Sequence, residues 1–193
     1  MVFLKKFRIR LLTKKVMQLQ QQRLTQQVAD EAIKKEIAHY HKLSFLYSKL
    51  QGSKHFPFAI DMSREMLRLA AQLHDAPAQY TLGLHYLEEA KWRDQLQREK
   101  TFSSQGNQEQ CASMFQEAIA YLMASSTSHL LAKRMLGACY IFGWGVDANN
   151  DKGLALIVES IALENSWNKA AQILTSLGLN RPEFFEALVK QRH

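Results

Sequence analysis

The sequence contains a glycine motif of the kind that binds dinucleotides and a pair of histidines of the kind that binds metal ions. The context or spacing of each argues against such a site. Gly143-x-Gly145-x2-Ala148 has the spacing of a dinucleotide-binding loop, but such a loop follows a strand, and the residues before Gly143 predict a helix. His39 and His41 are two residues apart, so on a helix their side chains point about 200° apart and cannot share a metal ion. We therefore predict no cofactor and no metal site.

The cysteines and the acidic pairs give no catalytic pattern either. Cys111 and Cys139 lie in different segments without a CxxC pair, which is typical of a protein kept in a reducing compartment, and we expect both side chains to be buried or half-buried. Adjacent carboxylates such as Glu88 and Glu89 point to different sides of a helix. The sequence therefore predicts a non-enzyme. A hydrolase whose catalytic residues come from distant positions on a helical scaffold is the alternative.

The composition favours a folded helical protein. The chain has 193 residues, of which 47% are hydrophobic, with only 8 Gly and 3 Pro, and this combination excludes a disordered chain and a turn-rich β-fold. No window approaches 18 apolar residues free of charge, and the basic start lacks the apolar run of a signal peptide. We expect a cytoplasmic protein, with peripheral association at the inner face of a membrane left open.

The net charge of +7 is concentrated at the start of the sequence. Residues 1–29 contain no acidic residue, whereas the rest of the chain has 18 basic and 18 acidic residues. The basic residues of this segment are Lys5, Lys6, Arg8, Arg10, Lys14, Lys15 and Arg23. Residues 1–36 contain no Gly or Pro and are rich in Lys, Arg, Gln and Leu, which predicts a long helix. We expect a basic N-terminal helical arm over residues 1–36, separable from the remainder.

Several partners fit this arm. On a helical wheel, four of its apolar residues fall within about 100° of one another: Phe3, Leu4, Phe7 and Leu11. Ile9 and Leu12 fall outside this sector, so the amphipathic pattern is imperfect. The arm could bind an anionic membrane, an acidic protein partner or RNA, or it could be a solvated helix that merely extends or caps the folded body of the protein. Nucleic acid is disfavoured because the aromatic residues that would stack on bases are absent beyond Phe3 and Phe7. A truncation starting near Asp30 is expected to stay folded and to lose association.

A motif repeats along the rest of the sequence. Ala78-x3-Leu82-Gly83-x2-Tyr86 returns 54 residues later as Ala132-x3-Leu136-Gly137-x2-Tyr140. Each motif predicts the first helix of a helix-turn-helix pair, and such repeats build solenoids. Gly83 and Gly137 have low helix propensity, so we expect them where two helix backbones approach closely. We also expect Gly143 and Gly145 to form a turn with positive φ.

The pattern predicts helices over about 37–50, 59–74, 77–92, 109–124, from 130 to the turn at Gly143, 151–164, 168–177 and 182–191. Asp151 is the expected cap of the helix 151–164. The polar segment 93–110 is predicted to be a mobile insertion. The segments APAQYTLGLHYL (76–87) and AKRMLGACYIFGWGVDANNDKGLALIVESIALENSWNKA (132–170) resemble the Sel-one-like repeat, a relative of the tetratricopeptide repeat. Gly153 and Leu154 depart from that pattern, in which Lys-Ala is commoner.

The resemblance implies an all-α, right-handed superhelix of about three helix pairs with capping helices over residues 37–193. Its units are 39–77, 78–131 and 132–169, with a C-terminal cap at 170–193. It also implies a non-catalytic adaptor or scaffold of a larger bacterial complex, in such families often linked to secretion or host interaction. The positions expected to line a concave face and to bind a partner helix or extended peptide are Lys42, Phe45, Leu46, Thr81, Leu84, His85, Met135, Ala138 and Cys139.

Overall fold

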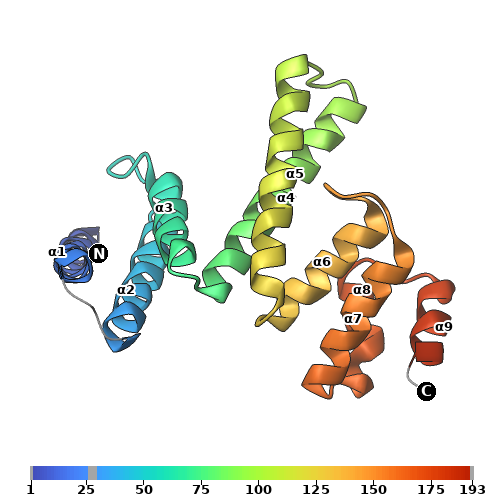
Figure 1. Cartoon of the computed structure of the whole chain (residues 1–193). Helices are drawn as coiled ribbons and strands as arrows, with labels where there is room; N and C mark the ends of the chain where they lie inside the picture. The colour runs from blue at the N-terminus through green and yellow to red at the C-terminus, as the bar shows by residue number, and fades with distance from the viewer. Residues whose placement is uncertain (1, 26–29, 192–193) are drawn as a thin grey trace. The chain divides into compact units, whose positions relative to one another are not determined.

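The computed structural model describes the backbone of residues 2–25 and 30–191, and every regular element in these ranges is helical. The elements are α1 (Val2–Thr25), α2 (Asp30–Ser48), α3 (Ala59–Gln72), α4 (Ala76–Arg98), α5 (Gln105–Ser126), α6 (Leu130–Phe142), α7 (Asn150–Glu164), a 3-10 turn η1 (Trp167–Lys169), α8 (Ala170–Ser176) and α9 (Pro182–Gln191) (Figure 1). The all-α prediction is confirmed. None of the described helices combines the length and the apolar character needed to cross a bilayer.

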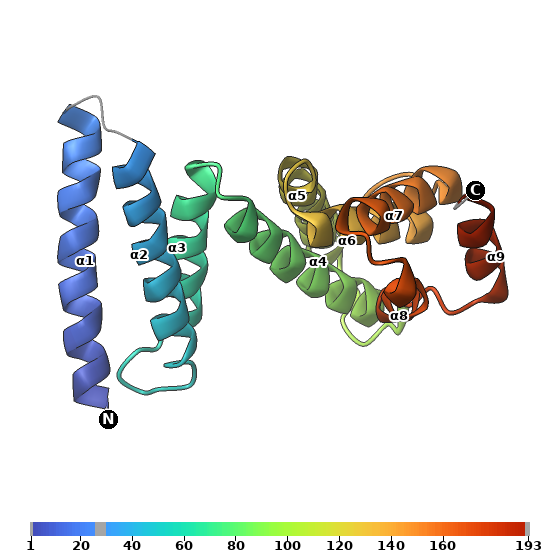
Figure 2. The ribbon, with the colours of Figure 1, turned by 90° about the horizontal axis from the view of Figure 1, so that it is seen from below.

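The chain divides into two compact units, residues 1–79 and 80–193, rather than at the predicted boundary after residue 36. In the first unit α2 lies between α1 and α3 (Figure 2). Helix α1 runs antiparallel to α2, since Lys5 lies beside the end of α2 at Lys49 and Gln20 donates to the Tyr40 hydroxyl at 2.6 Å. The expected N-terminal arm is therefore the outer helix of a packed layer, and residues 26–29 of it lie outside the described residues.

The face of α1 that packs on α2 is not the apolar sector expected from the sequence. Ile9 and Val16 are buried, and Leu12 and Leu19 are half-buried at the spacing of one helix face. Leu4, Phe7 and Leu11 lie on the opposite side and are 64%, 61% and 48% exposed, while the side chain of Phe3 lies outside the described part. Helix α1 thus has two apolar faces, of which only one is covered within the first unit.

A buried carboxylate joins α1 to α2. Glu36 is 1% exposed, and its Oε2 lies 3.1 Å from Nε of Arg23 on α1. Its Oε1 accepts a hydrogen bond from the Tyr40 hydroxyl at 2.8 Å. Burial and this hydrogen bond raise the pKa of Tyr40. Because a buried carboxylate without partners would be costly, this network fixes the position of α1 on α2.

Glycines mark the close helix contacts of the second unit, as predicted. A Cβ on Gly83 of α4 would lie 2.9 Å from Cγ of Leu122 on α5. A Cβ on Gly137 of α6 would lie 2.6 Å from the carbonyl oxygen of Gly153 on α7, and one on Gly153 would lie 2.6 Å from the carbonyl oxygen of Gly137. The contact between the two glycines accounts for a glycine at position 153, where a larger side chain would clash.

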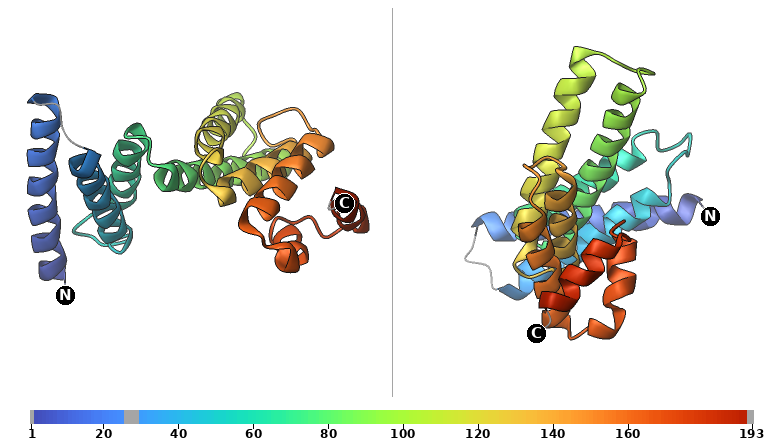
Figure 3. Two further views of the ribbon diagram at one scale, coloured as in Figure 1. Left: turned by 60° about the horizontal axis from the view of Figure 1, so that its bottom comes forward. Right: turned by 90° about the vertical axis from the view of Figure 1, so that its right-hand side faces the viewer.

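Both ends of the segment 93–110, which the sequence predicted to be loop-like, are helical, so that prediction is wrong for residues 93–98 and 105–110. Helix α4 continues to Arg98 and α5 begins at Gln105, which leaves a short turn between two long helices (Figure 3). The turn is held by Ser104, whose hydroxyl accepts from the Asn107 amide at 3.1 Å. The buried Asn107 side chain donates to the backbone carbonyls of Arg93 and Phe102, both at 3.3 Å. Polar residues therefore build this hairpin where their composition suggested a loop.

The turn between α6 and α7 follows the prediction in its glycines and departs from it in its cap. Gly143 and Gly145 have φ values of 69° and 70°. The residue that caps α7 is Asn149 rather than Asp151, because the Asn149 side chain accepts a hydrogen bond from the backbone amide of Lys152 at 2.9 Å.

The C-terminal helices α8 and α9 form one hydrophobic core with α7. Its buried residues include Ile157, Ile161, Leu174, Leu179 and Phe184.

Candidate interaction surfaces

A groove in the first unit contains all three of its predicted partner-binding residues. Lys42, Phe45 and Leu46 of α2 line a hollow of about 370 Å³ together with Arg8, Leu11 and Leu12 of α1. Phe45 is 61% exposed, and the Lys49 ammonium lies 5.2 Å from the centre of its ring. The structure thus brings part of the expected concave face and part of the expected arm together on one surface.

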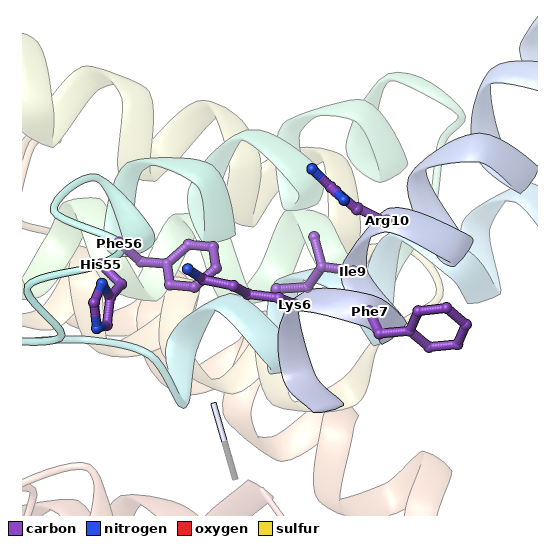
Figure 4. A pocket seen from close by; sticks show the side chains of 6 residues that line it. All are labelled: Lys6, Phe7, Ile9, Arg10, His55 and Phe56. Carbon is purple, nitrogen blue, oxygen red and sulfur yellow. The ribbon is translucent and has the colours of Figure 1, made fainter. Parts of the chain in front are cut away.

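A second hollow, of about 380 Å³, lies on the other flank of α1, against the turn between α2 and α3 (Figure 4). It is lined by Lys6, Phe7, Ile9, Arg10, His55 and Phe56. The Lys6 ammonium lies 5.6 Å from the centre of the Phe56 ring, whereas the Phe7 ring points away from that turn (Figure 4). This cation–π contact ties the start of α1 to the α2–α3 turn.

The positive charge extends beyond the predicted arm. Residues 37–60, like residues 1–29, contain no Asp or Glu, and they add Lys42, Lys49 and Lys54. The first unit holds 14 basic and 6 acidic residues, a net charge of +8, and the second unit has a net charge of −1. The basic character therefore belongs to the whole first unit, and it is greatest where α1 begins and α2 ends.

In the second unit, two of the predicted partner-binding residues are in the core, and that part of the prediction is wrong. Ala138 and Cys139 are both fully buried, because α6 is covered on more than one side and Cys139 packs with Leu87 and Leu136. Burial raises the pKa of the Cys139 thiol to about 12, so it is neutral near pH 7. The remaining predicted positions of this unit are Thr81, Leu84 and Met135, which are half-buried, and His85, which is exposed.

A cleft that the sequence did not predict lies farther along α4. It measures about 530 Å³ and is lined by Glu88, Lys91, Trp92, Asp94, Gln95, Arg98 and Trp144. Trp92 is 58% exposed, and the Lys91 ammonium lies 4.3 Å from the centre of the Trp144 ring. The residues at 81, 85, 88, 92 and 95 follow one helix face, so the spacing of His85 and Trp92 could have extended the predicted surface to this cleft.

His41 and Asp75 form a pair that joins α2 to the start of α4. Nε2 of His41 lies 2.7 Å from Oδ2 of Asp75, and this hydrogen bond raises the pKa of His41. The same Oδ2 accepts from the Ala78 amide at 2.9 Å, so Asp75 also caps α4. Within residues 2–25 and 30–191, no group of three or more His, Cys, Asp and Glu is placed to hold a metal ion. The pair thus has a structural role in the first unit.

Comparisons with known proteins do not identify what this protein binds. No model of a known protein family matches the chain, and no curated protein matches it. The resemblance to the Sel-one-like repeat stays a prediction based on the spacing within residues 76–87 and 132–170. What the molecule binds has to be argued from the basic first unit and from the tryptophan cleft of the second.

Proposed function

We propose that the protein is a non-catalytic adaptor that binds a protein partner through the outer face of α4. The observation that carries the proposal is the open cleft around Trp92 and Trp144. Its two indole rings and four charged side chains have the composition of a protein interface, where exposed Trp and Arg supply much of the binding energy. Paired helices held together at Gly83 and Gly137 support a solenoid of about three right-handed pairs, the architecture of repeat adaptors.

The cleft fits an amphipathic helix or an extended peptide. Thr81, His85, Glu88, Trp92 and Gln95 follow one side of α4 over nearly four turns, which gives a partner helix a surface of matching length. The charges of the cleft lining are mixed in sign, so a partner would offer both acidic and basic residues around an apolar anchor. The family resemblance extends the proposal to assembly of a bacterial complex linked to secretion or host interaction.

The test compares Trp92→Ala with a matched control. The tagged full chain is used to capture partners from a lysate, the recovered partner is identified, and its Kd is then measured with purified proteins. Truncating Trp92 should weaken binding at least about 30-fold, the effect of losing a hot-spot residue. Phe102→Ala removes an aromatic side chain of similar exposure, 56%, from the turn after α4 and should leave the Kd unchanged.

A double variant tests the face predicted from the sequence. His85→Glu with Met135→Glu adds two charges where the solenoid reading places the partner, and binding should fall if the partner extends beyond the cleft. If Trp92→Ala and this double variant both bind the partner with the affinity of the original chain, the proposed surface is wrong.

A further inference from the structure

We propose that the first unit docks on anionic lipid through the uncovered face of α1 and the adjoining end of α2. We define the docking face by its exposed apolar residues, which are Leu4, Phe7, Leu11 and Phe45, and by the cations beside them, which are Arg8, Arg10, Lys14, Lys15 and Lys42. The proposal concerns the first unit alone and is independent of the cleft on α4.

The geometry of α1 separates its packing face from its docking face. Ile9 and Val16 face α2, whereas Leu4, Phe7 and Leu11 fall within about 60° of one another on the other side. On the helical wheel, Lys14 and Arg10 flank this apolar strip on one side, and Arg8 and Lys15 flank it on the other. A narrow apolar strip between two rows of cations is the arrangement of helices that lie in the membrane interface.

The neighbouring helix continues the same surface. Leu11 of α1 and Phe45 of α2 line one groove, in which Arg8 and Lys42 supply the charges. Neither helix has an acidic residue in this region, because residues 1–29 and 37–60 lack Asp and Glu. The nearest carboxylates in sequence are Asp30 and Glu31 at the start of α2, and the buried Glu36 paired with Arg23. Charge complementarity therefore favours an anionic surface over a partner of mixed charge.

The exposed residues favour lipid over RNA and over an acidic peptide. RNA-binding surfaces stack successive bases on aromatic rings, whereas two of the four exposed apolar residues of the docking face, Leu4 and Leu11, are aliphatic and interrupt any such row. A peptide in the groove at Leu11 and Phe45 would leave Leu4 and Phe7 uncovered, because these two lie outside the groove and are more than 60% exposed on a helix that ends the layer. Side chains in that position suit insertion among lipid headgroups, with the neighbouring cations at the level of the phosphates.

The test is flotation of the full chain with phosphatidylcholine vesicles that contain or lack phosphatidylserine, at low and high salt. Binding should require phosphatidylserine and should weaken as salt screens the cations. Lys14→Gln with Lys15→Gln should lower the vesicle partition constant about 30-fold, since each cation near an anionic membrane contributes about fivefold. Lys34→Gln with Lys35→Gln makes the same change in net charge on exposed residues of α2 and should have little effect.

A second comparison tests the apolar strip. Phe7→Ser with Leu11→Ser should lower the partition constant at least about tenfold, because these side chains leave water on insertion. Leu24→Ser changes a residue that is 80% exposed at the other end of the same helix, and it should bind as the original chain does. Circular dichroism of each variant verifies that the helices are retained.

Three results would overturn the proposal. The first is that the full chain fails to float with phosphatidylserine vesicles at low salt. The second is that the Lys14/Lys15 and Lys34/Lys35 variants lose binding equally, because then only net charge matters. The third is that polyglutamate or single-stranded polyuridylate binds the docking face while vesicles do not, which would assign it to an acidic protein or to RNA.

Discussion

Replacing Arg23 by Met should destabilise the first unit strongly, because among the described residues it leaves the buried Glu36 carboxylate with the Tyr40 hydroxyl as its one partner. Breaking a fully buried ion pair costs about 3–5 kcal/mol. The Arg23 side chain is 35% exposed, so water can reach part of the site, and we expect about 2–3 kcal/mol. In a unit of 79 residues this corresponds to a melting temperature lower by about 10–20 °C.

The distribution of tryptophan gives this experiment an internal control. All three tryptophans lie in the second unit: Trp92, Trp144 and Trp167. Their fluorescence therefore reports unfolding of residues 80–193, whereas circular dichroism reports both units. In the Arg23→Met variant, part of the helical signal should be lost at lower temperature, and the fluorescence transition should stay where it is.

Two further variants decide whether the buried charge is the cause. Adding Glu36→Met to Arg23→Met removes the unpaired carboxylate and should recover most of the lost stability. Lys35→Met removes the exposed partner of Glu31 and should cost less than about 0.5 kcal/mol. If Arg23→Met costs no more than Lys35→Met, Glu36 does not hold α1 in place. For the same reason, a truncation at Asp30 should destabilise the first unit rather than leave it folded, which reverses the expectation from the sequence.

Two other predictions concern single positions. Gly137→Ala should destabilise the second unit by about 1–3 kcal/mol in urea titrations, because the new methyl group would meet the Gly153 carbonyl at 2.6 Å. Gly106→Ala lies in the first turn of α5, where an added Cβ would meet no atom within 4 Å, so it should be neutral or should stabilise the unit by up to about 0.5 kcal/mol. Equal effects of the two substitutions would contradict the packing argument. The hydrogen bond to Asp75 raises the pKa of His41, so its contribution to stability is complete below about pH 6.5 and is lost as pH rises through the higher folded-state pKa. Melting temperatures across this range should fall for the original chain and should fall less for His41→Gln, and parallel curves would show that the pair is not responsible.

The sequence predicted the helices well where an apolar stripe and glycines coincide. The helices around Gly83 and Gly137 lie where the repeat places them, because close packing leaves little choice of residue. The sequence-based prediction was wrong where polar side chains stabilise a turn through hydrogen bonds. Asn107 and Ser104 look like loop residues in isolation, yet their hydrogen bonds close the α4–α5 turn.

The candidate surfaces were predictable only in part, because burial depends on neighbours that spacing does not reveal. In α6 the apolar residues nearly encircle the helix, which is typical of a buried helix, so the sequence did carry a signal that Ala138 and Cys139 are covered. The sequence did not decide between the two apolar faces of α1. Its Ile9 and Val16 are fewer and less conspicuous than the exposed Leu4, Phe7 and Leu11, and only the contact with α2 decides between the two faces.

The paired glycines of α6 and α7 limit how this part of the chain can evolve. Each of Gly137 and Gly153 leaves room for the carbonyl of the other, so neither can acquire a side chain by a single mutation without a clash. At Gly83 the nearest atom is Cγ of the Leu122 side chain, which a substitution by a smaller residue could remove. Over many generations the α4–α5 pair can therefore diverge through compensating substitutions, whereas the crossing of α6 and α7 should keep both glycines while its turns vary.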